Sequence, residues 1–423
     1  MTEGKARKEA LTGKIVVLGL QHTFVMFGAT ILVPIITGLD VGVTLFAAGT
    51  GTLLFHFLTQ WKVPVFLGSS FAFIPGLLAV GQNNPALIPY ALGGIVIAGL
   101  LYLAAAALFM VVPYGTIRKI LPPHVTGSMI ILIGLILAPV AVSNANGTYS
   151  PELAASIGTL GCWALALFTF GLGVFVKIGL AKSKFPFLSA LPVLLALVGG
   201  YLISVLFGLV DFSSVQSADF LGVPTFTLPR FSATAITVMV PIAVVTIVEH
   251  FGDVLAIGNV VEKDFVKDPG IHRTLLGDGL ATTFSAFIGG PANTTYSENT
   301  GAIAFTGVHN PVVMRIAALF AIALALIPKF TALVSTVPAP VIGGISILLF
   351  GMISSIGIKS MVDARVNLGD PKILIVSATM LVLGLGEATF EFGNVQLSGL
   401  GLAAIAGVVL NLILNYRDIT GKS

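Results

Sequence analysis

The stretch GGPANTTYSENTG, at Gly289–Gly301, decides how the rest of the chain is interpreted. It is polar, contains Gly and Pro, and carries one carboxylate, Glu298, yet strongly apolar runs flank it on both sides. A bilayer tolerates irregular backbone only where protein shields it or where it lines a cavity. A discontinuous membrane helix is also a sequence marker of a transporter's binding site. The stretch therefore predicts a broken membrane helix at the centre of a transport site.

A second interrupted stretch, LGSSFAFIPG at Leu67–Gly76, resembles the first and lies about 225 residues earlier. Each contains two hydroxyl residues followed by an aromatic residue. Two further matches occur in the same order: Gln21-His22 with Glu249-His250, and the Pro-rich 122–127 with 338–343. Three matches in one order predict an internal repeat, with the two broken helices facing each other around one substrate.

Composition places the chain in a membrane. Of its 423 residues, 56% are hydrophobic and 9% are charged, whereas soluble domains average about 25% charged residues. Apolar runs of about 20 residues, each long enough to cross a bilayer, recur along the chain. The single cysteine, Cys162, excludes an internal disulfide. The polar, basic start of the chain does not predict a cleavable signal.

We predict an all-α polytopic membrane protein with about 14 transmembrane segments. Because seven spans per repeat is an odd number, the second repeat must be inverted relative to the first. Spans 3 and 10 are the broken ones and carry short extended stretches. The predicted spans are 15–37, 42–60, 65–82, 86–112, 122–141, 153–176, 185–208, 232–258, 274–289, 293–307, 311–328, 338–358, 372–387 and 396–416.

The distribution of basic residues supports this topology. With the N-terminus in the cytoplasm, all of the 21 Lys and Arg residues except Arg230 and Lys329 fall in segments on the cytoplasmic side. A wrong number of spans would mix the two sides. The positive-inside rule therefore predicts a multi-pass protein of the cell inner membrane with both termini in the cytoplasm.

Few acidic residues lie within the predicted spans: Glu249, Asp253 and Glu298, with Asp278 near the start of the ninth span. An intramembrane carboxylate is a functional candidate by default. Glu249 and Asp253 are four residues apart and share a helix face, where two ionised carboxylates would repel each other. We predict that this pair carries a proton at rest, as a proton-coupling site needs. The alternatives are a structural hydrogen-bonding pair and, for Glu298, a cap on the backbone amides of the break.

The histidines leave alternatives open. His22 and His250 could orient a carboxylate or fill a packing contact, whereas His56 and His124 are expected near the ends of spans. The sequence predicts no metal site and no cofactor, since no His, Cys or carboxylate set has ligand spacing. No nucleotide-binding motif occurs, which argues against an ATP-driven pump. A nucleic-acid partner is not predicted.

The chain resembles the nucleobase–ascorbate transporters (nucleobase:cation symporter-2 family), and within them the bacterial uracil permeases. The resemblance extends over nearly the whole chain. Its motifs are LQHTFVMFGATILVP at Leu20–Pro34, LGSSFAFIPG at Leu67–Gly76, VEHFGDVLAIGNVV at Val248–Val261, DPGIHRTLLGDGLAT at Asp268–Thr282 and NTTYSENTGAIAFTG at Asn293–Gly307.

This resemblance implies import of a nucleobase, most directly uracil, by proton symport with alternating access between two domains. It implies that the protein is not an enzyme, that its substrate is a small molecule and that it lies in a lipid bilayer. A homodimer is possible. The implied domains are a core (15–113 and 231–329), a gate (114–230 and 330–416) and cytoplasmic tails (1–14 and 417–423).

The resemblance also implies roles for single residues. Glu249 and Glu298 would bind the base, with the backbone amides at Phe71 and Ser297 and the rings of Phe71 and Tyr296 beside it. Proton coupling would involve Glu249, Asp253 and Glu298, with the proton as coupling ion. Supporting positions are Gln21, His22, His250, Asn299 and Phe350.

Three positions depart from the pattern of uracil permeases. Asp253 stands where a histidine is usual, Ser297 replaces a glycine, and Phe350 stands where some relatives have tyrosine. Xanthine or another purine base therefore remains an alternative substrate. An anion transporter of the same 7+7 architecture is a second alternative, although its carboxylates would repel an anion. An intramembrane enzyme is a third, but no nucleophile–base arrangement accompanies the acids.

Overall fold

The computed structural model describes residues 2–81, 84–112, 114–183, 186–392 and 395–416. Most of these residues are helical. In the first half of the chain the elements are α1 (Thr2–Thr37), α2 (Val41–Leu58), β1 (Leu67–Ser69), η1 (Phe71–Phe73), α3 (Ile74–Gly81), η2 (Pro85–Leu87), α4 (Ile88–Val111), α5 (Tyr114–Ile120), α6 (Pro123–Ile136), α7 (Ala138–Ala145), α8 (Pro151–Val174), η3 (Phe175–Gly179), η4 (Leu180–Lys182), η5 (Pro186–Ala190), α9 (Pro192–Leu206) and α10 (Ser213–Ser217).

The second half begins with the long helix α11 and contains strand β2, which pairs with β1, and strands β3 and β4, which pair with each other. Its elements are α11 (Ala233–Val261), η6 (Val266–Gly270), α12 (Ile271–Ile288), β2 (Asn293–Thr295), α13 (Ser297–Thr306), α14 (Val312–Ala325), α15 (Pro328–Ser335), α16 (Ala339–Asp363), α17 (Pro371–Leu385), β3 (Thr389–Phe392), β4 (Val395–Ser398) and α18 (Gly399–Leu414).

Each of the predicted spans contains a helix. Among the described residues, seven helices are long and apolar enough to cross a membrane, and the pair α14–α15, bent by 86°, would be an eighth. Four further apolar helices are shorter. The structure therefore confirms a multi-helix apolar fold, while the count of 14 spans stays a prediction. Helix α1 begins at Thr2, so from that residue on the predicted tail, 1–14, is part of the first helix.

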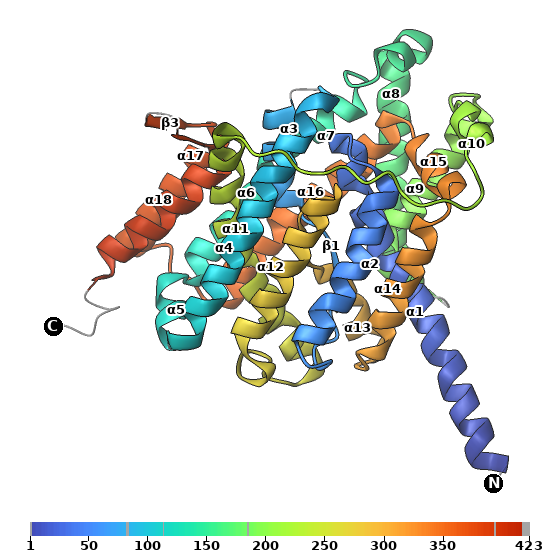
Figure 1. Cartoon of the computed structure of the whole chain (residues 1–423). Helices are drawn as coiled ribbons and strands as arrows, with labels where there is room; N and C mark the ends of the chain where they lie inside the picture. The colour runs from blue at the N-terminus through green and yellow to red at the C-terminus, as the bar shows by residue number, and fades with distance from the viewer. Residues whose placement is uncertain (1, 82–83, 113, 184–185, 393–394, 417–423) are drawn as a thin grey trace.

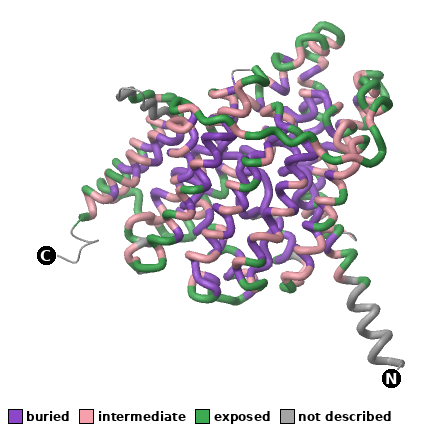
Figure 2. The backbone as a smooth tube through the Cα atoms, in the orientation of Figure 1, coloured by how far each residue is buried: buried purple, intermediate pink, exposed green. Residues whose placement is uncertain are grey.

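The helices pack in two groups (Figure 1). In the first, α12 packs against α2 and α4, α11 against α4, and α14 against α1 and α2. In the second, α16 packs against α6, α7 and α8, and α17 packs against α18. Contacts from α11 to α6 and α18 join the groups. The buried residues run through the middle of both groups (Figure 2).

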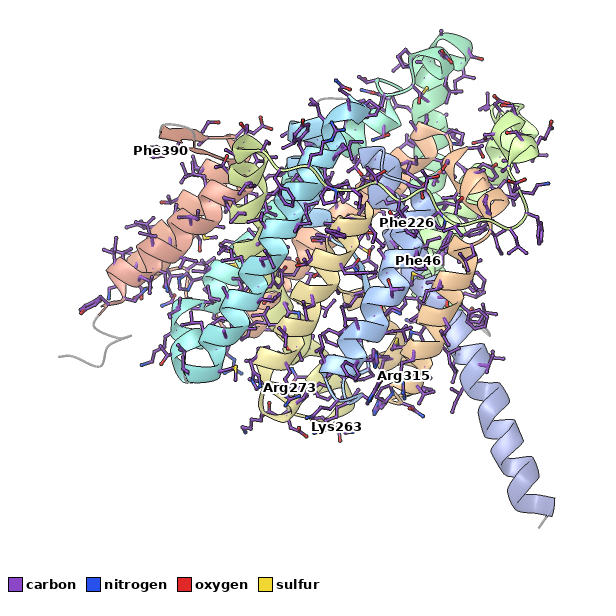
Figure 3. The ribbon with its side chains drawn as sticks, viewed as in Figure 1. Phe46, Phe226, Lys263, Arg273, Arg315 and Phe390 are labelled. Carbon is purple, nitrogen blue, oxygen red and sulfur yellow. The ribbon has the colours of Figure 1, made fainter. Side chains whose placement is uncertain are left out.

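Labelled residues distinguish the two ends of the bundle. Lys263, Arg273 and Arg315 lie at the end where α1 begins, which we call the basic end (Figure 3). Phe46 and Phe226 lie toward the other end, the apolar end. A hairpin of β3 and β4, paired from Thr389↔Ser398 to Phe392↔Val395, lies at the apolar end before α18. The sequence analysis did not predict this hairpin.

The two interrupted stretches meet at the centre of the fold. Strands β1 and β2 pair antiparallel, with Leu67 opposite Thr295 and Ser69 opposite Asn293. A helix follows each strand directly: η1 and α3 after β1, and α13 after β2. This confirms that spans 3 and 10 are broken, carry extended backbone and face each other. We call the paired strands and the starts of these helices the crossing.

Candidate functional site

Hydroxyl side chains hold the extended backbone of the crossing in place. The Thr52 hydroxyl of α2 accepts from the Leu67 amide at 2.9 Å, and Thr282 of α12 donates to the Asn293 carbonyl at 2.8 Å. The Ser69 hydroxyl donates to the Thr30 carbonyl of α1 at 3.0 Å. Buried backbone groups outside helices need such partners. These bonds explain why a stretch so rich in Ser and Thr can remain irregular inside an apolar bundle.

Tyr296 locks the two strands together. Its hydroxyl donates to the Ser69 carbonyl at 2.9 Å, and its amide donates to the Phe66 carbonyl at 3.1 Å. Its ring lies against Gly68, where an added Cβ would come within 2.5 Å of the ring. Only glycine allows this approach. Tyr296 is buried, with 3% of its surface exposed, so the structure assigns it a bracing role in addition to any contact with substrate.

Two of the predicted acidic residues share a cavity. Glu249 and Asp253, one turn apart on α11, are both partly buried and line a space of about 670 Å³ toward the basic end. Helices α6 and α16 form the opposite wall, including Thr126 and Lys359. Thr300 of α13 completes the wall beside the crossing. The cavity thus lies between the two helix groups.

Asp253 contacts the crossing directly. Its Oδ2 accepts a hydrogen bond from the Thr295 hydroxyl of β2 at 2.7 Å. The sequence predicted an interaction of Asp253 with Glu249 from their spacing, but gave no indication of a partner 42 residues away. The carboxylate on α11 is therefore bonded to the strand from which α13 begins.

His250 lies in a buried cluster between α11 and α12. Its Nδ1 lies 3.1 Å from Oδ2 of Asp278, and its Nε2 lies 3.0 Å from the Thr274 hydroxyl. All three residues are fully buried between α11 and α12, and the ring of Tyr102 on α4 is buried nearby. Asp278 lies within α12 rather than at its start. The sequence analysis missed this cluster, although an acid in an apolar span was a signal for it.

In the Gln21-His22 pair of the first span, the two side chains have different surroundings. Asn299 of α13 lies 3.3 Å from both Nδ1 and the carbonyl of His22. His22 is fully buried, and its Nε2 has no hydrogen-bond partner among the residues that the structure describes. Gln21 is partly buried on the adjacent side of α1. His22 therefore connects α1 to α13, and does not pair with a carboxylate in the described part of the chain.

The remaining predicted residues lie around the crossing. Phe71, the first residue of η1, packs edge-on against Phe350 of α16 with ring centroids 5.9 Å apart. Backbone at Ser297 and Glu298 forms the first turn of α13, but their side chains lie outside what the structure describes. The first amides of a helix have no intrahelical acceptors. The helix starts at Phe71 and Ser297 can therefore offer N–H donors to a ligand.

Two histidines lie near helix ends, as expected, and are buried there. His56, expected near the membrane interface, is fully buried, and its Nε2 lies 2.9 Å from the Val65 carbonyl that precedes β1. His124, 5% exposed, is buried as well. Their position at the membrane interface stays a prediction. No group of three or more potential metal ligands occurs among the described residues.

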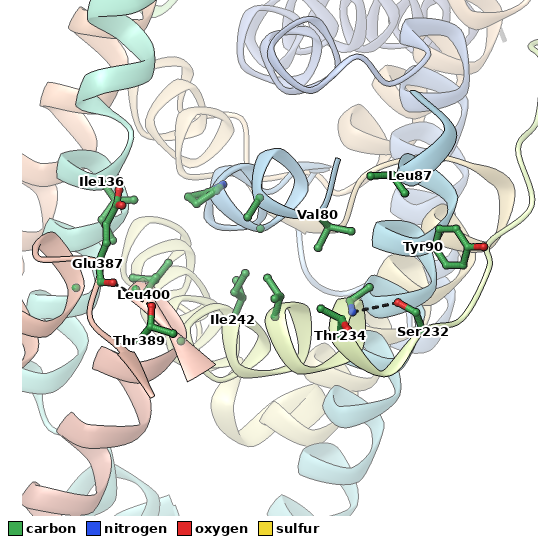
Figure 4. A pocket seen from close by; sticks show the side chains of 18 residues that line it. Val80, Leu87, Tyr90, Ile136, Ser232, Thr234, Ile242, Glu387, Thr389 and Leu400 are labelled. Carbon is green, nitrogen blue, oxygen red and sulfur yellow. Dashed lines mark hydrogen bonds between the residues drawn. The ribbon is translucent and has the colours of Figure 1, made fainter. Parts of the chain in front are cut away.

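A second cavity, of about 790 Å³, opens at the apolar end between the same helix groups (Figure 4). Ile242 of α11 and Ile136 of α6 line it, with Tyr90, Glu387 and Thr389 around it. The interface between α11 and α6 therefore has one cavity toward the apolar end and one toward the basic end.

Comparisons with known proteins identify the family. A model of the Permease family matches residues 13–392. The uracil permease of Bacillus caldolyticus is 42% identical over 419 residues, covering 96% of this chain and 93% of that protein. The uracil permease of Escherichia coli (strain K12) is 36% identical over 409 residues, covering 95% and 91%. These matches confirm the resemblance seen in the sequence.

Solved structures share the fold. The chain resembles SLC26A9 with a TM-score of 0.72 and 12% identity, covering 96% of this chain and 65% of that chain. It resembles the transmembrane domain of the cyanobacterial bicarbonate transporter BicA with a TM-score of 0.57 and 15% identity, covering 96% and 97%. Identities this low speak for the fold alone. Taken with the family match, the chain belongs to the Permease family and is a multi-pass membrane transporter, not an enzyme.

Proposed function

We propose that this permease imports a nucleobase, most directly uracil, by proton symport. The observation that carries the proposal is the 42% identity to a uracil permease over almost the full length of both chains. The family match at residues 13–392 spans the crossing, Glu249 and Asp253. The relatives from Bacillus caldolyticus and Escherichia coli are both named uracil permeases.

The chemistry of the crossing suits uracil. Uracil offers two N–H donors and two carbonyl acceptors. Glu249 and Glu298 would accept from the N–H groups, and the amides at Phe71 and Ser297 would donate to the carbonyls. The rings of Phe71 and Tyr296 would supply a flat apolar wall. Two helix N-termini at one site also offset the negative charge of the acids.

The proposed movement is alternating access. The core would comprise 15–113 and 231–329, and the gate 114–230 and 330–416, in two inverted repeats of seven spans. The packing supports this proposal, since α11 lines both cavities from one side and α6 lines both from the other, joined by α16 at the basic end and by α17 and α18 at the apolar end. The basic end would face the cytoplasm at the cell inner membrane. The cavity that contains Glu249 and Asp253 would then be the cytoplasmic vestibule.

Proton coupling is assigned to Glu249 and Asp253, with Glu298 as a further candidate. The support is that Glu249 and Asp253 share a cavity wall and that Asp253 is bonded to Thr295 of the crossing. Protonation of Asp253 would change that bond, because a neutral carboxyl is a weaker acceptor. The remaining polar residues, Gln21, His22, His250 and Asn299, would hold the helices around the site in position.

The test is uptake of radiolabelled uracil into proteoliposomes under an imposed pH gradient. Unlabelled uracil, xanthine and other bases compete in parallel assays, and so do bicarbonate, sulfate and chloride. We expect accumulation that uracil alone abolishes at low concentration. If xanthine competes more strongly than uracil, xanthine is the substrate. Competition by an anion would favour anion transport, the function in the name of the BicA structure. No uptake of any base in either direction would refute the proposal.

A further inference from the structure

An extended strap, residues 219–231, joins α10 to α11 and crosses one side of the molecule near the apolar end (Figure 1). It has no regular secondary structure, but backbone hydrogen bonds tie it in turn to the ends of several helices. These bonds, donor first, are Gly222 to Leu326 (3.1 Å), Lys329 to Asp219 (3.1 Å), Thr227 to Ile288 (3.2 Å) and Arg230 to Pro89 (2.8 Å). The strap is therefore fixed to α14, α15, α12 and α4.

Close packing shows that this path is built into the fold. Gly289, which ends α12 with φ of 104°, lies so near the strap that a Cβ would sit 2.8 Å from the Thr227 amide. A Cβ on Gly93 of α4 would collide with the Arg230 carbonyl. Phe226 packs against α2, with its ring centroid 5.6 Å from that of Phe46 (Figure 3), and remains 41% exposed.

The outward side of the strap is apolar. Five of its six large hydrophobic side chains are exposed by more than half: Phe220 (70%), Leu221 (72%), Val223 (73%), Leu228 (67%) and Phe231 (55%). Asp219 and Arg230 are its only charged residues. Figure 2 shows the strap as an exposed line across the purple helices behind it. A soluble loop with this composition would expose a continuous apolar surface to water.

We propose that the strap lies in the interfacial layer of the bilayer and that its outward side chains contact lipid. Its position at the ends of apolar helices places it at the depth where aromatic residues and Arg collect in membrane proteins. The bonds to helix ends satisfy backbone groups that the interface would otherwise leave unpaired. Arg230 can keep its guanidinium in the headgroup layer while its stem stays apolar.

A second copy of this chain fits the strap less well than lipid. A stable protein interface needs about 800 Å² of contiguous surface on each partner. The exposed side chains instead follow a single line of residues around several helices, which matches the edge of a membrane. A lipid interface also accounts for the position of the line at one end of the bundle rather than across its middle.

Spin labelling of single cysteines tests the depth of the strap. The only natural cysteine, buried Cys162, is replaced by alanine. Cysteines are then introduced singly at Val223 and Leu228, and the labelled protein is reconstituted in phospholipid vesicles. Leu319, 56% exposed on α14, is the lipid-facing control, and Gln216 on α10, also exposed, is the aqueous control. Collision with oxygen reports lipid exposure, and collision with a water-soluble nickel chelate reports water exposure.

We expect the oxygen-to-nickel collision ratio at both strap positions to be several-fold above that of Gln216 and below that of Leu319. A ratio equal to that of Gln216 would place the strap in water and refute the proposal. Dipolar broadening between labels, with little collision of either reagent, would show a contact between protomers and would refute it as well. Uptake activity of each labelled protein confirms that it is folded.

Discussion

Glu249 is the residue on which the proposed binding chemistry depends most. It is partly buried on α11 and lines the cavity toward the basic end. We expect Glu249→Ala to abolish measurable uracil binding while the protein stays extractable and monodisperse, because the base would lose its main acceptor. Isothermal titration with uracil measures this. Glu152→Ala, in the exposed first turn of α8, is the matched control, and wild-type affinity in a folded Glu249→Ala protein would contradict the assignment.

Glu298 is expected to bind the base directly from the first turn of α13. The change Glu298→Gln converts one acceptor into a donor that faces a donor, which costs about 1–3 kcal/mol for each group left unpaired. We therefore expect a loss of affinity of about 10-fold to 100-fold. Competition binding in detergent measures it. Unchanged affinity would leave Glu298 as a cap of its own helix.

Single residues show what the sequence could and could not predict. The costly acids Glu249 and Asp253 were visible because charge is rare in an apolar span, and the structure places both on one cavity wall. The partners of Asp253 and His250, Thr295 and Asp278, were not predicted, because they depend on how separate helices pack. Spacing along one helix specifies a shared face, but not which neighbour that face meets.

At the scale of elements, the crossing depends on close contact at Gly68. Substitution Gly68→Ala would force a Cβ to within 2.5 Å of the Tyr296 ring. Overpacking of this kind destabilises proteins by about 1–3 kcal/mol. We expect a lower thermal midpoint and weaker uracil binding, since both helix starts would shift. Gly171→Ala on α8, where a Cβ meets no atom within 4 Å, should change neither. Equal midpoints for the two variants would show that the strands can separate without cost.

The helices and their breaks could be predicted where apolar runs and polar interruptions mark them in the sequence. The crossing followed from two similar polar interruptions, and their pairing is confirmed. The β3–β4 hairpin and the early start of α1 were not predicted. Short strands between apolar helices leave little periodicity in the sequence, and a charged N-terminal segment can extend a helix beyond the apolar run. The strap was seen only as a connection, because its path depends on hydrogen bonds to several helix ends.

At the scale of the whole molecule, the fold has one interface with a cavity at each end. The cavity at the apolar end is about 790 Å³ and the one at the basic end about 670 Å³. The crossing and the Phe71–Phe350 contact lie along the interface between the helix groups. A transporter that alternates its access needs such an interface, because a sliding contact can close one side while it opens the other.

The last prediction concerns coupling across the whole cycle. A histidine at position 253 could carry a positive charge beside Glu249, whereas Asp253 is either neutral or negative. We expect Asp253→Asn to keep uracil exchange between two equal pools and to lose accumulation driven by a pH gradient. The amide can still accept from Thr295, but it cannot take up or release a proton. Counterflow and gradient-driven uptake in the same proteoliposomes separate the two activities.

Two matched variants complete this experiment. Asp253→His restores the residue usual in uracil permeases and should keep both exchange and accumulation. Thr295→Val removes the hydroxyl that donates to Asp253 at 2.7 Å while leaving the carboxylate able to titrate. It should therefore retain accumulation, with a shifted pH dependence, since the ionised carboxylate loses a donor that stabilised it. If Asp253→Asn concentrates uracil as well as the wild type does, Asp253 is not the coupling site, and the proton must be carried by Glu249 or Glu298.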